Sequence, residues 1–405
     1  MPQFFENFFK DRLAELKQQG NYREFQTIKR IVGRFPKAHS HTLNKEIIIC
    51  CSNDYLGLGQ NKKILNAIKE SLFKMGAGAG GTRNISGSSE AIFKLEETLN
   101  RLHNKPASLV FSSGFVANAT TLSTLGKNIP QVVLFSDEKN HASIIEGIKN
   151  SGAEKVIFKH NNINDLEEKL KLFPLSQPKI IIFEAIYSMD GDFSKVKEIA
   201  SLAKKYHALT FLDEVHSVGL YGKRGGGYAQ ELGLEDSIDI IQGTFGKAFG
   251  GVGGYISASK EIVDFVRSFA SGFIFTTALP PHICSGALKA VEYVMENSWE
   301  RDLLHKKVVK LKKLLHKNNL PLLASSEGHI MPLMVGDAKK TREISNRLLE
   351  DYGIYLQPIN YPTVPKGLER LRLTITPLHS DEMLKHIVVA LREVFQKYNL
   401  IENAA

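Results

Sequence analysis

One lysine, Lys247, lies in a stretch of twelve residues, 243–254, of which six are glycine. Its neighbours carry little bulk, so backbone and ligand can approach each other closely there. An apolar run at 238–241 precedes the stretch and is typical of a buried strand. A lysine amine in such a setting can form a Schiff base with a carbonyl compound. A surface loop lysine shows the same local pattern, so this stretch alone leaves both interpretations open.

The stretch does not match the phosphate-binding P-loop, which also combines glycine and lysine. That motif needs four residues between its first glycine and Gly-Lys, followed by Ser or Thr. Here two residues separate Gly243 from Gly246, and Ala248 follows Lys247. A P-loop is therefore excluded.

Polar residues after other apolar runs are candidate partners for the lysine. Asp213 and His216 follow the run 208–212, and His141 follows the run 131–135. Sites in parallel α/β sheets lie at the carboxyl ends of the strands. A carboxylate there can pair with a protonated pyridine nitrogen, as in pyridoxal phosphate (PLP) enzymes, and a histidine can stack on a flat ring. Asp213 could also be a helix cap or a metal ligand, and His216 a structural histidine.

Two further segments follow strand candidates. Residues 112–115 open a helix after the run 107–111, and the N–H groups of a helix start suit a phosphate. Serine is also a common N-cap, so a plain cap is the alternative. Ser188 follows the run 178–183 and is placed to hydrogen-bond a ligand, although 190–191 could simply form a turn.

Residues 76–87 form the most unusual tract, with four glycines in six residues. Glycine at this density indicates a loop with uncommon backbone angles, and such loops often carry binding. A flexible linker is the alternative, but Thr82, Arg83 and Asn84 are not typical of linkers.

Apolar runs and helical segments alternate from about residue 62 to residue 260. Near-continuous apolar strands between helices indicate an α/β domain with a mostly parallel sheet. After Pro321 the pattern becomes mixed and predicts a smaller α+β domain, while an amphipathic helix interrupted at Gly20 is predicted over 4–30. The strand candidates are 107–111, 131–135, 155–158, 178–183, 208–212 and 238–242, and the main helical candidates are 62–75, 88–103, 142–151, 163–173, 194–206, 281–319, 339–352 and 381–398.

Composition places the chain among ordinary globular proteins. It has 405 residues, 43% hydrophobic, and a net charge of +9. Part of that charge lies in the run 306–317, whose helical spacing favours a solvated helix face over an anion-attracting surface. No apolar run approaches the roughly 20 residues of a membrane helix, and we find no nucleic-acid motif. The three cysteines show no metal-ligand spacing. We expect a cytoplasmic protein without a targeting segment, metal, membrane or nucleic-acid partner.

The segments 52–57, 140–143, 188–191, 213–216 and 243–247, taken in order, resemble the α-oxoamine synthases. These PLP-dependent enzymes transfer acyl groups from CoA to amino acids, and the resemblance covers nearly the whole chain. It implies an aspartate-aminotransferase-like fold of PLP fold type I. The large domain would hold a mostly parallel seven-stranded sheet beside a smaller α+β C-terminal domain. The implied boundaries are 1–58 for an N-terminal helix and arm, 59–295 for the large domain and 296–405 for the small one.

Within this family, the segments 76–87, 271–277 and 359–367 are most similar to the branch that condenses glycine with succinyl-CoA. Its product is 5-aminolevulinate, the first committed compound of tetrapyrrole and haem synthesis by this route. The segments 21–23 and 35–38 add to this similarity. One departure is 88–92, where many members carry histidines and this chain has Ser-Ser-Glu-Ala-Ile. A role for those histidines is therefore not expected here.

The resemblance also implies a role for each matching residue. Lys247 would hold PLP as a Schiff base and move protons, Asp213 would pair with the pyridine nitrogen, and His141 would stack on the ring. The other cofactor contacts would come from Ser188 and His216 near the phenolic oxygen, from Ser113, Gly114, Phe115 and Thr244 at the phosphate, and from Thr276 and Thr277 of the other subunit of a homodimer. The substrate contacts would come from Asn53 and Arg372 at the glycine carboxylate, and from Arg23, Thr82, Asn84, Ile85 and Thr363 at the succinyl-CoA. Arg23 is the candidate for the far carboxylate of the acyl group, since a guanidinium binds a carboxylate bidentately.

Three other functions remain to be weighed. A sibling synthase would use another pair of substrates, for example glycine and acetyl-CoA. A non-catalytic partner subunit would be expected to lack the lysine, but Lys247, Asp213 and His141 are all present. A nucleic-acid-binding protein is supported by the net charge alone.

Overall fold

The computed structural model describes residues 1–402, which divide into two compact units. Unit 1 comprises Met1–Ser52, Met189–Gly191 and the chain from Leu303 onward, and unit 2 comprises Asn53–Ser188 and Asp192–Asp302. The boundary at residue 302 falls inside helix α12 (Trp299–Lys317). Within the described residues, no helix is long and apolar enough to cross a membrane.

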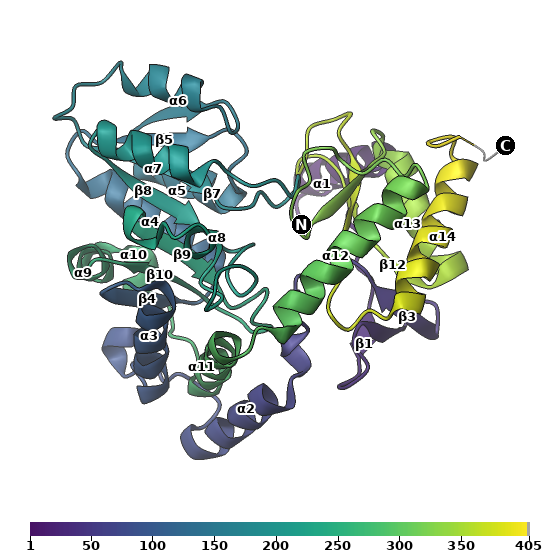
Figure 1. Ribbon diagram of the computed structural model, residues 1–405, viewed down its shortest axis with the longest axis horizontal. Helices are drawn as coiled ribbons and strands as arrows, with labels where there is room; N and C mark the ends of the chain where they lie inside the picture. The colour runs from purple at the N-terminus through teal and green to yellow at the C-terminus, as the bar shows by residue number, and fades with distance from the viewer. Residues whose placement is uncertain (403–405) are drawn as a thin grey trace. The chain divides into compact units, whose positions relative to one another are not determined.

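A seven-stranded sheet forms the centre of unit 2 (Figure 1). Its order is β4-β10-β9-β8-β7-β5-β6, and β10 alone runs antiparallel to its neighbours. The sheet is therefore mostly parallel, as predicted. Its strands are β4 (Ala107–Phe111), β5 (Val133–Asp137), β6 (Glu154–Phe158), β7 (Lys179–Glu184), β8 (Ala208–Asp213), β9 (Ile240–Thr244) and β10 (Gly254–Ala258).

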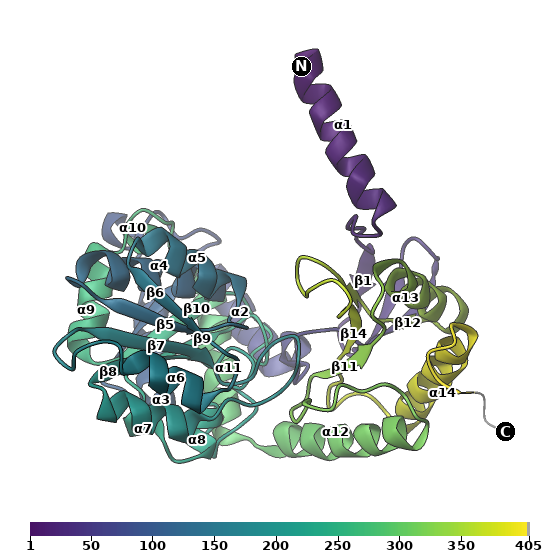
Figure 2. The ribbon, with the colours of Figure 1, turned by 90° about the horizontal axis from the view of Figure 1, so that it is seen from above.

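Both faces of this sheet are covered by helices, which explains the continuous apolar runs. On β7, Ile180 and Ile182 pack into the core on one face, while Ile181 and Phe183 pack into the core on the other. This alternation follows from the two-residue period of a strand. Figure 2 shows α4 (Gly114–Asn128) and α5 (Ala142–Ser151) on one side of the sheet and α6 (Ile163–Leu170) and α7 (Val196–Lys205) on the other.

The remaining helices of unit 2 include those predicted over 62–75 and 88–103. The helix α2 begins and ends where the sequence pattern does. These elements are α2 (Lys62–Met75), α3 (Glu90–His103), α8 (Tyr228–Glu231), α9 (Lys260–Phe269), α10 (Ser271–Ile274) and α11 (Pro281–Glu296), with short 3₁₀ turns at Leu58–Gln60, Arg83–Ile85 and Glu235–Ser237.

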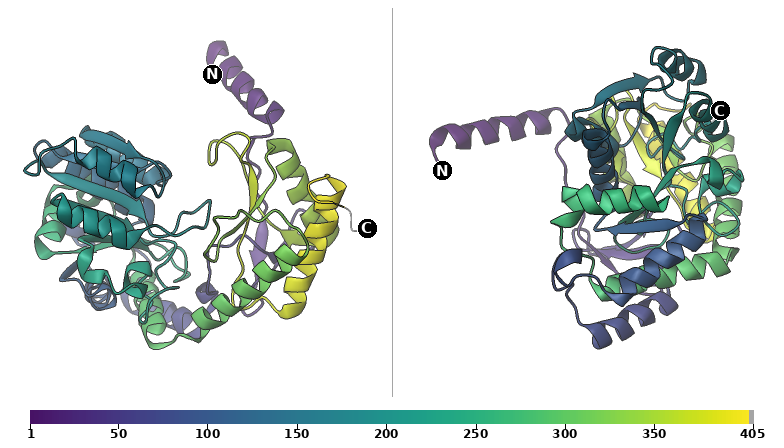
Figure 3. Two further views of the ribbon diagram at one scale, coloured as in Figure 1. Left: turned by 45° about the horizontal axis from the view of Figure 1, so that its top comes forward. Right: turned by 90° about the vertical axis from the view of Figure 1, so that its left-hand side faces the viewer.

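Unit 1 contains two small sheets and three further helices. One sheet has the order β1-β2-β3-β12 and the other has the order β11-β14-β13. Figure 3 shows α13 and α14 beside these strands, and the two helices pack against each other. The elements are α1 (Gln3–Gln18), β1 (Ile28–Arg30), β2 (Lys37–Ser40), β3 (Lys45–Ile49), β11 (Met331–Met334), α13 (Ala338–Tyr352), β12 (Ile354–Tyr355), β13 (Pro358–Ile359), β14 (Arg370–Leu373) and α14 (Asp381–Lys397).

Two predicted helices are shorter in the structure. The N-terminal helix ends at Gln18, because Gly20 adopts a left-handed conformation with φ +74°. The long helical stretch 281–319 breaks between α11 and α12, where Asn297 is extended. A helix cannot pass through an extended residue, so the chain starts a new helix at Trp299.

The basic run on α12 is less solvated than its charge suggests. The ammonium groups of Lys307 and Lys312 donate hydrogen bonds to backbone carbonyls, that of Lys312 to Ser326 at 2.8 Å. Burial lowers the pKa of Lys312 to about 8. These two lysines therefore hold loops of unit 1, and only part of the run is an exposed face.

Candidate active site

The polar residues predicted at strand ends lie at one edge of the unit 2 sheet. Asp213 ends β8, and its register partners on the neighbouring strands are Glu184 and Gln242. His141 follows β5 and caps α5, while Lys247 follows β9. The charge on Lys247 contributes to lowering the pKa of His141, so the two side chains share one electrostatic environment.

Asp213 is buried and held at both carboxylate oxygens. Oδ1 accepts a hydrogen bond from the backbone N–H of Val215 at 2.9 Å, and Oδ2 accepts one from the amide of Asn118 at 2.7 Å. A buried carboxylate needs hydrogen-bond donors, and Asp213 has one at each oxygen. Its fixed position at the end of β8 suits a cationic nitrogen.

His141 is oriented by a hydrogen-bonded chain that begins at Asn118. The amide of Asn118 donates to Ser143 Oγ at 3.0 Å, and Ser143 Oγ lies 2.7 Å from His141 Nδ1. The backbone N–H of Ser143 also points at Nδ1, at 3.2 Å. Nδ1 is therefore an acceptor, which places the imidazole proton on Nε2. Surrounding atoms desolvate the imidazole and lower its pKa, so the ring is neutral near pH 7.

Glu184 adds a second buried acid beside Asp213. Its Oε1 accepts a hydrogen bond from the backbone N–H of His141 at 2.6 Å. Burial raises the pKa of Glu184 well above its ordinary value, and the charge of Asp213 raises it further. Glu184 therefore holds the turn that carries His141 without adding a second full charge to the site.

The loop that carries Lys247 depends on close backbone approach. Gly250 has φ +68°, and a Cβ there would lie 2.1 Å from the backbone nitrogen of Gly59. The backbone N–H of Gly250 donates to the carbonyl of Lys247 at 2.8 Å and closes the turn. Gly250 is therefore needed for this close approach of two backbone segments, as the sequence predicts for the stretch.

A cradle suited to a phosphate lies at the start of α4. Ser113 caps this helix by accepting a hydrogen bond from Val116 N at 3.1 Å. A Cβ on Gly114 would lie 3.2 Å from Thr244 Oγ1, so the glycine keeps the helix start open beside that hydroxyl. Phe115 follows, with its ring 6.4 Å from the His141 ring between centroids. The first N–H groups of a helix have no partner within the helix and favour an anion.

His216 is linked to Asn53 through a tyrosine. The hydroxyl of Tyr55 lies 2.8 Å from His216 Nδ1 and donates to Asn53 Oδ1 at 3.1 Å. Tyr55 and His216 are buried, whereas Asn53 is exposed. Ser188 is half-buried and lies in a loop whose base is closed by a bridge between Ile186 and Phe193.

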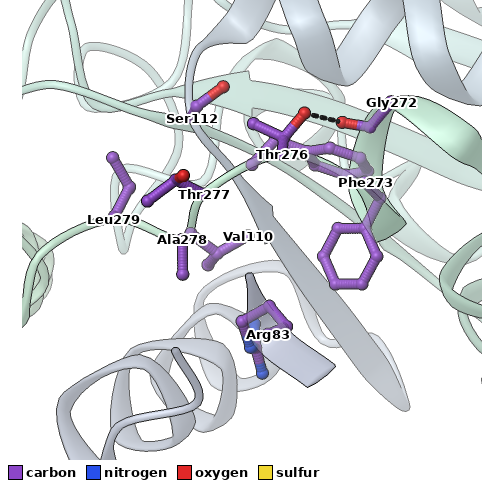
Figure 4. Close-up of a pocket in the computed structure, with 10 residues that line it drawn as sticks. Arg83, Val110, Ser112, Gly272, Phe273, Thr276, Thr277, Ala278 and Leu279 are labelled. Atoms are coloured by element: carbon purple, nitrogen blue, oxygen red, sulfur yellow. Dashed lines mark hydrogen bonds between the residues drawn. The ribbon is translucent and has the colours of Figure 1, made fainter. Parts of the chain in front are cut away.

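The glycine-rich tract 76–87 pairs with the segment that carries Thr277. Thr82 and Thr277 form an antiparallel bridge, and Ala278 N donates to Gly81 O at 3.0 Å. Figure 4 shows Thr276 and Thr277 lining a small pocket with Ser112 and Arg83. The Thr276 hydroxyl already donates to Gly272 O at 2.6 Å, whereas Thr277 is exposed. Asn84 and Ile85 are exposed on the same tract.

Arg83 holds this tract in place. Its guanidinium binds Glu96 through two hydrogen bonds, of 2.7 and 3.2 Å, and its Nε donates to Ser88 Oγ at 3.1 Å. Residues 88–92, where the sequence departs from the family pattern, therefore stabilise the local structure. Ser88 binds Arg83, Ser89 caps α3, and Ile92 is buried.

Three predicted substrate residues lie in unit 1. Arg23 and Thr363 are exposed, and the segments that carry them are joined where the Asn360 amide donates to Gly20 O at 3.4 Å. Arg372 is buried in β14. The other predicted site residues all belong to unit 2.

The residues of unit 2 fit PLP. A buried carboxylate, a neutral histidine, a lysine and an open helix start meet the needs of its pyridine nitrogen, ring, aldehyde and phosphate. Sequence reasoning missed Asn118, Ser143, Glu184 and Tyr55, which hold the predicted residues. Tyr55 and Ser143 stand within the motif segments, and Glu184 directly follows the strand candidate 178–183, so their position in the sequence was the available signal.

Comparison with known proteins identifies the family of this chain. The model of the family "Aminotransferase class I and II" matches residues 45–391. A protein of Rhizobium meliloti named 5-aminolevulinate synthase is 50% identical over 403 residues, 99% of this chain and 100% of the relative. A protein of the same name from Rickettsia bellii is 50% identical over 98% of this chain and 95% of the relative.

Solved structures show the same fold. A serine palmitoyltransferase from S. paucimobilis, with PLP bound, superposes with a TM-score of 0.90 at 28% identity, covering 99% of this chain and 100% of that one. The 8-amino-7-oxononanoate synthase of Francisella tularensis gives a TM-score of 0.75 at 26% identity, covering 88% of this chain and 99% of that one. Both likenesses confirm the predicted PLP fold type I.

Proposed function

Because the chain belongs to the class I and II aminotransferase family, and within it to the 5-aminolevulinate synthases, we propose how its residues carry out that reaction. The chain is a PLP-dependent acyltransferase that condenses glycine with succinyl-CoA. The reaction releases CoA and CO₂ and gives 5-aminolevulinate, the first step of haem synthesis. The observation that carries this function is 50% identity over nearly the full length of a synthase.

Bound PLP supplies an electron sink for negative charge that develops at the glycine α-carbon. Lys247 would hold the cofactor aldehyde, and its amine would move the proton at the glycine α-carbon. Asp213 keeps a proton on the pyridine nitrogen, a role supported by its burial and its two hydrogen-bond donors. His141 would stack on the ring, and Ser188 and His216 would bind near the phenolic oxygen.

The cradle at the start of α4 binds the cofactor phosphate. Ser113, Gly114 and Phe115 contribute mainly backbone N–H groups, and Thr244 contributes its hydroxyl. The open space that Gly114 leaves beside Thr244 supports this assignment. Thr277, with Thr276, completes the phosphate site from the other subunit.

Different residues are assigned to glycine and to succinyl-CoA. Asn53 and Arg372 bind the glycine carboxylate, and Arg23 binds the far carboxylate of the succinyl group, because a guanidinium matches a carboxylate with two hydrogen bonds. The remaining residues that line the succinyl-CoA site are Thr82, Asn84, Ile85 and Thr363.

A homodimer with the active site at the subunit interface is supported by exposed apolar side chains in unit 2. Ile85 is 69% exposed, Phe275 79% and Phe73 81%, and they lie on or near the segments assigned to the site. Exposed apolar surface of this kind favours association. The cytoplasmic location stays a prediction.

A CoA-release assay on the purified protein with PLP and glycine tests the function. Succinyl-CoA and acetyl-CoA are compared side by side, and the product is analysed for aminolevulinate. We expect a strong preference for succinyl-CoA. A preference for acetyl-CoA would keep the fold and the role of Lys247 but would make the chain a sibling synthase and refute the role of Arg23.

A further inference from the structure

A half-buried histidine outside the site described above joins the end of β5 to the loop that follows β7. His160 follows β6, and 12% of its side chain is exposed. Its Nδ1 lies 2.9 Å from Asp137 Oδ1, and its Nε2 lies 2.7 Å from Asp192 Oδ2. Ionised carboxylates only accept hydrogen bonds, so both ring nitrogens must donate and the ring is an imidazolium. Neither nitrogen then offers a lone pair to a metal ion.

The surroundings of His160 support the charged ring. Burial alone would lower its pKa, but the hydrogen bonds to Asp137 and Asp192 raise the pKa to about 9. The ring of Tyr187 packs against it edge to face, with centroids 4.4 Å apart. Asn161 binds the same two carboxylates, since its backbone N–H donates to Asp137 at 3.0 Å and its side-chain amide donates to Asp192 at 3.1 Å.

The two carboxylates belong to the loops that carry His141 and Ser188. Asp137 ends β5, and its carbonyl accepts a hydrogen bond from the N–H of Asn140 at 3.2 Å, one residue before His141. The carbonyl of Asp192 accepts a hydrogen bond from the N–H of Tyr187 at 3.2 Å, one residue before Ser188. A single side chain therefore connects the backbones of both loops.

We propose that His160 is a positioning residue that fixes the His141 turn against the Ser188 loop and so sets the spacing of two side chains that contact PLP. The inference rests on the roles proposed above for His141 and Ser188. His160 acts through the two loops and does not itself touch the cofactor. Removing the imidazolium leaves two buried carboxylates without their shared donor, and the loops should separate.

Titration of the apoprotein with PLP, followed by absorbance and by circular dichroism of the bound cofactor, tests this role. For His160→Gln we expect the Kd for PLP to rise about tenfold, with a changed cofactor dichroism and an unchanged far-ultraviolet spectrum. The control is Ile199→Ala, which removes a buried side chain of α7 from the core of the same unit. It should lower the Tm and leave the Kd within about twofold of the wild type.

A Kd within about twofold of the wild type for His160→Gln would overturn the proposal, as would an equal rise for Ile199→Ala. If His160→Gln does not fold, Asp192→Asn provides the test, since it keeps an acceptor oxygen and removes one charge. We expect the Kd of this variant for PLP to rise at least about threefold, and an unchanged Kd would refute the positioning role of His160. Failure of the wild-type protein to bind PLP would instead refute the proposed function.

Discussion

Asn118 binds Asp213 through a hydrogen bond of 2.7 Å between its amide nitrogen and the carboxylate Oδ2. The second N–H of the same amide donates to Ser143 Oγ, which contacts the imidazole of His141. One buried side chain in the middle of α4 thus orients the acid assigned to the pyridine nitrogen and the histidine assigned to the ring face. The positions of these two groups are coupled.

Replacing Asn118 with alanine should therefore weaken PLP binding. The change removes both donors and leaves Asp213 Oδ2 without its amide partner, at a cost of about 1–3 kcal/mol. We expect a higher Kd in a PLP titration of the apoprotein, together with a lower Tm. The control is Asn128→Ala in the last turn of α4, whose amide contacts only the Thr124 carbonyl among the hydrogen bonds of the described chain. Equal PLP affinity for the two variants would contradict the role of Asn118.

Lys247→Ala should abolish turnover and the visible absorption band of the lysine-bound cofactor. No other amine in the described part of the chain is assigned to the cofactor aldehyde. The fold should survive, because the Lys247 contribution to the turn is a backbone carbonyl bound by Gly250. Absorbance spectra and the CoA-release assay measure the two effects. Persistence of both the band and the activity would remove Lys247 from its role.

Much of the fold is readable from local patterns. The six predicted strands of the large sheet are recovered because each contains an apolar run, and all but the edge strand β6 are largely buried. The seventh, β10, was not among these runs, because its five residues follow directly on the glycine-rich stretch. The break between α11 and α12 was also not predicted, because the helical pattern continues on both sides of Asn297, although asparagine favours helix ends.

Some residues of the candidate site could likewise be predicted from the sequence, and others could not. Lys247, Asp213 and His141 stand in short motifs at strand ends and could be predicted. Asn118 could not, because it lies inside a helix and its partner Asp213 is 95 residues away. Long-range hydrogen bonds of this kind depend on how α4 is positioned relative to the end of β8, and no local sequence pattern encodes that position.

Arg23→Leu should weaken the use of succinyl-CoA more than the use of uncharged acyl-CoAs. The guanidinium is the group assigned to the far carboxylate, and losing a charged hydrogen bond costs about 1.5–3 kcal/mol. We expect kcat/KM for succinyl-CoA to fall by roughly 10- to 150-fold. The control is Arg12→Leu on the exposed helix α1, where Arg12 pairs only with the nearby Glu15 among the ion pairs of residues 1–402. Unchanged acyl preference would mean that another cation binds the carboxylate.

The hydrogen bonds of His160 to Asp137 and Asp192 should make the thermal stability of the protein depend on pH in a defined direction. The folded protein raises the pKa of His160 to about 9 from an ordinary 6.5. A group whose pKa is raised on folding stabilises the protein fully below its unfolded pKa, and this contribution is lost as pH rises through the folded pKa. Asp137 and Asp192 bind the two ring nitrogens, and Glu138 accepts a hydrogen bond from the backbone N–H of His160 at 2.9 Å.

Thermal denaturation of the wild type and of His160→Gln between about pH 6 and pH 10 measures this effect. We expect the largest difference in Tm near pH 6.5 and a steadily smaller difference as pH passes 9, because the imidazolium of the wild type is then deprotonated. The control is His207→Asn, which removes an exposed histidine of unit 2 at φ 51°, a backbone angle that asparagine tolerates. That variant should follow the wild-type profile. A constant difference in Tm for His160→Gln across the range would show that the ring is not charged in the folded protein.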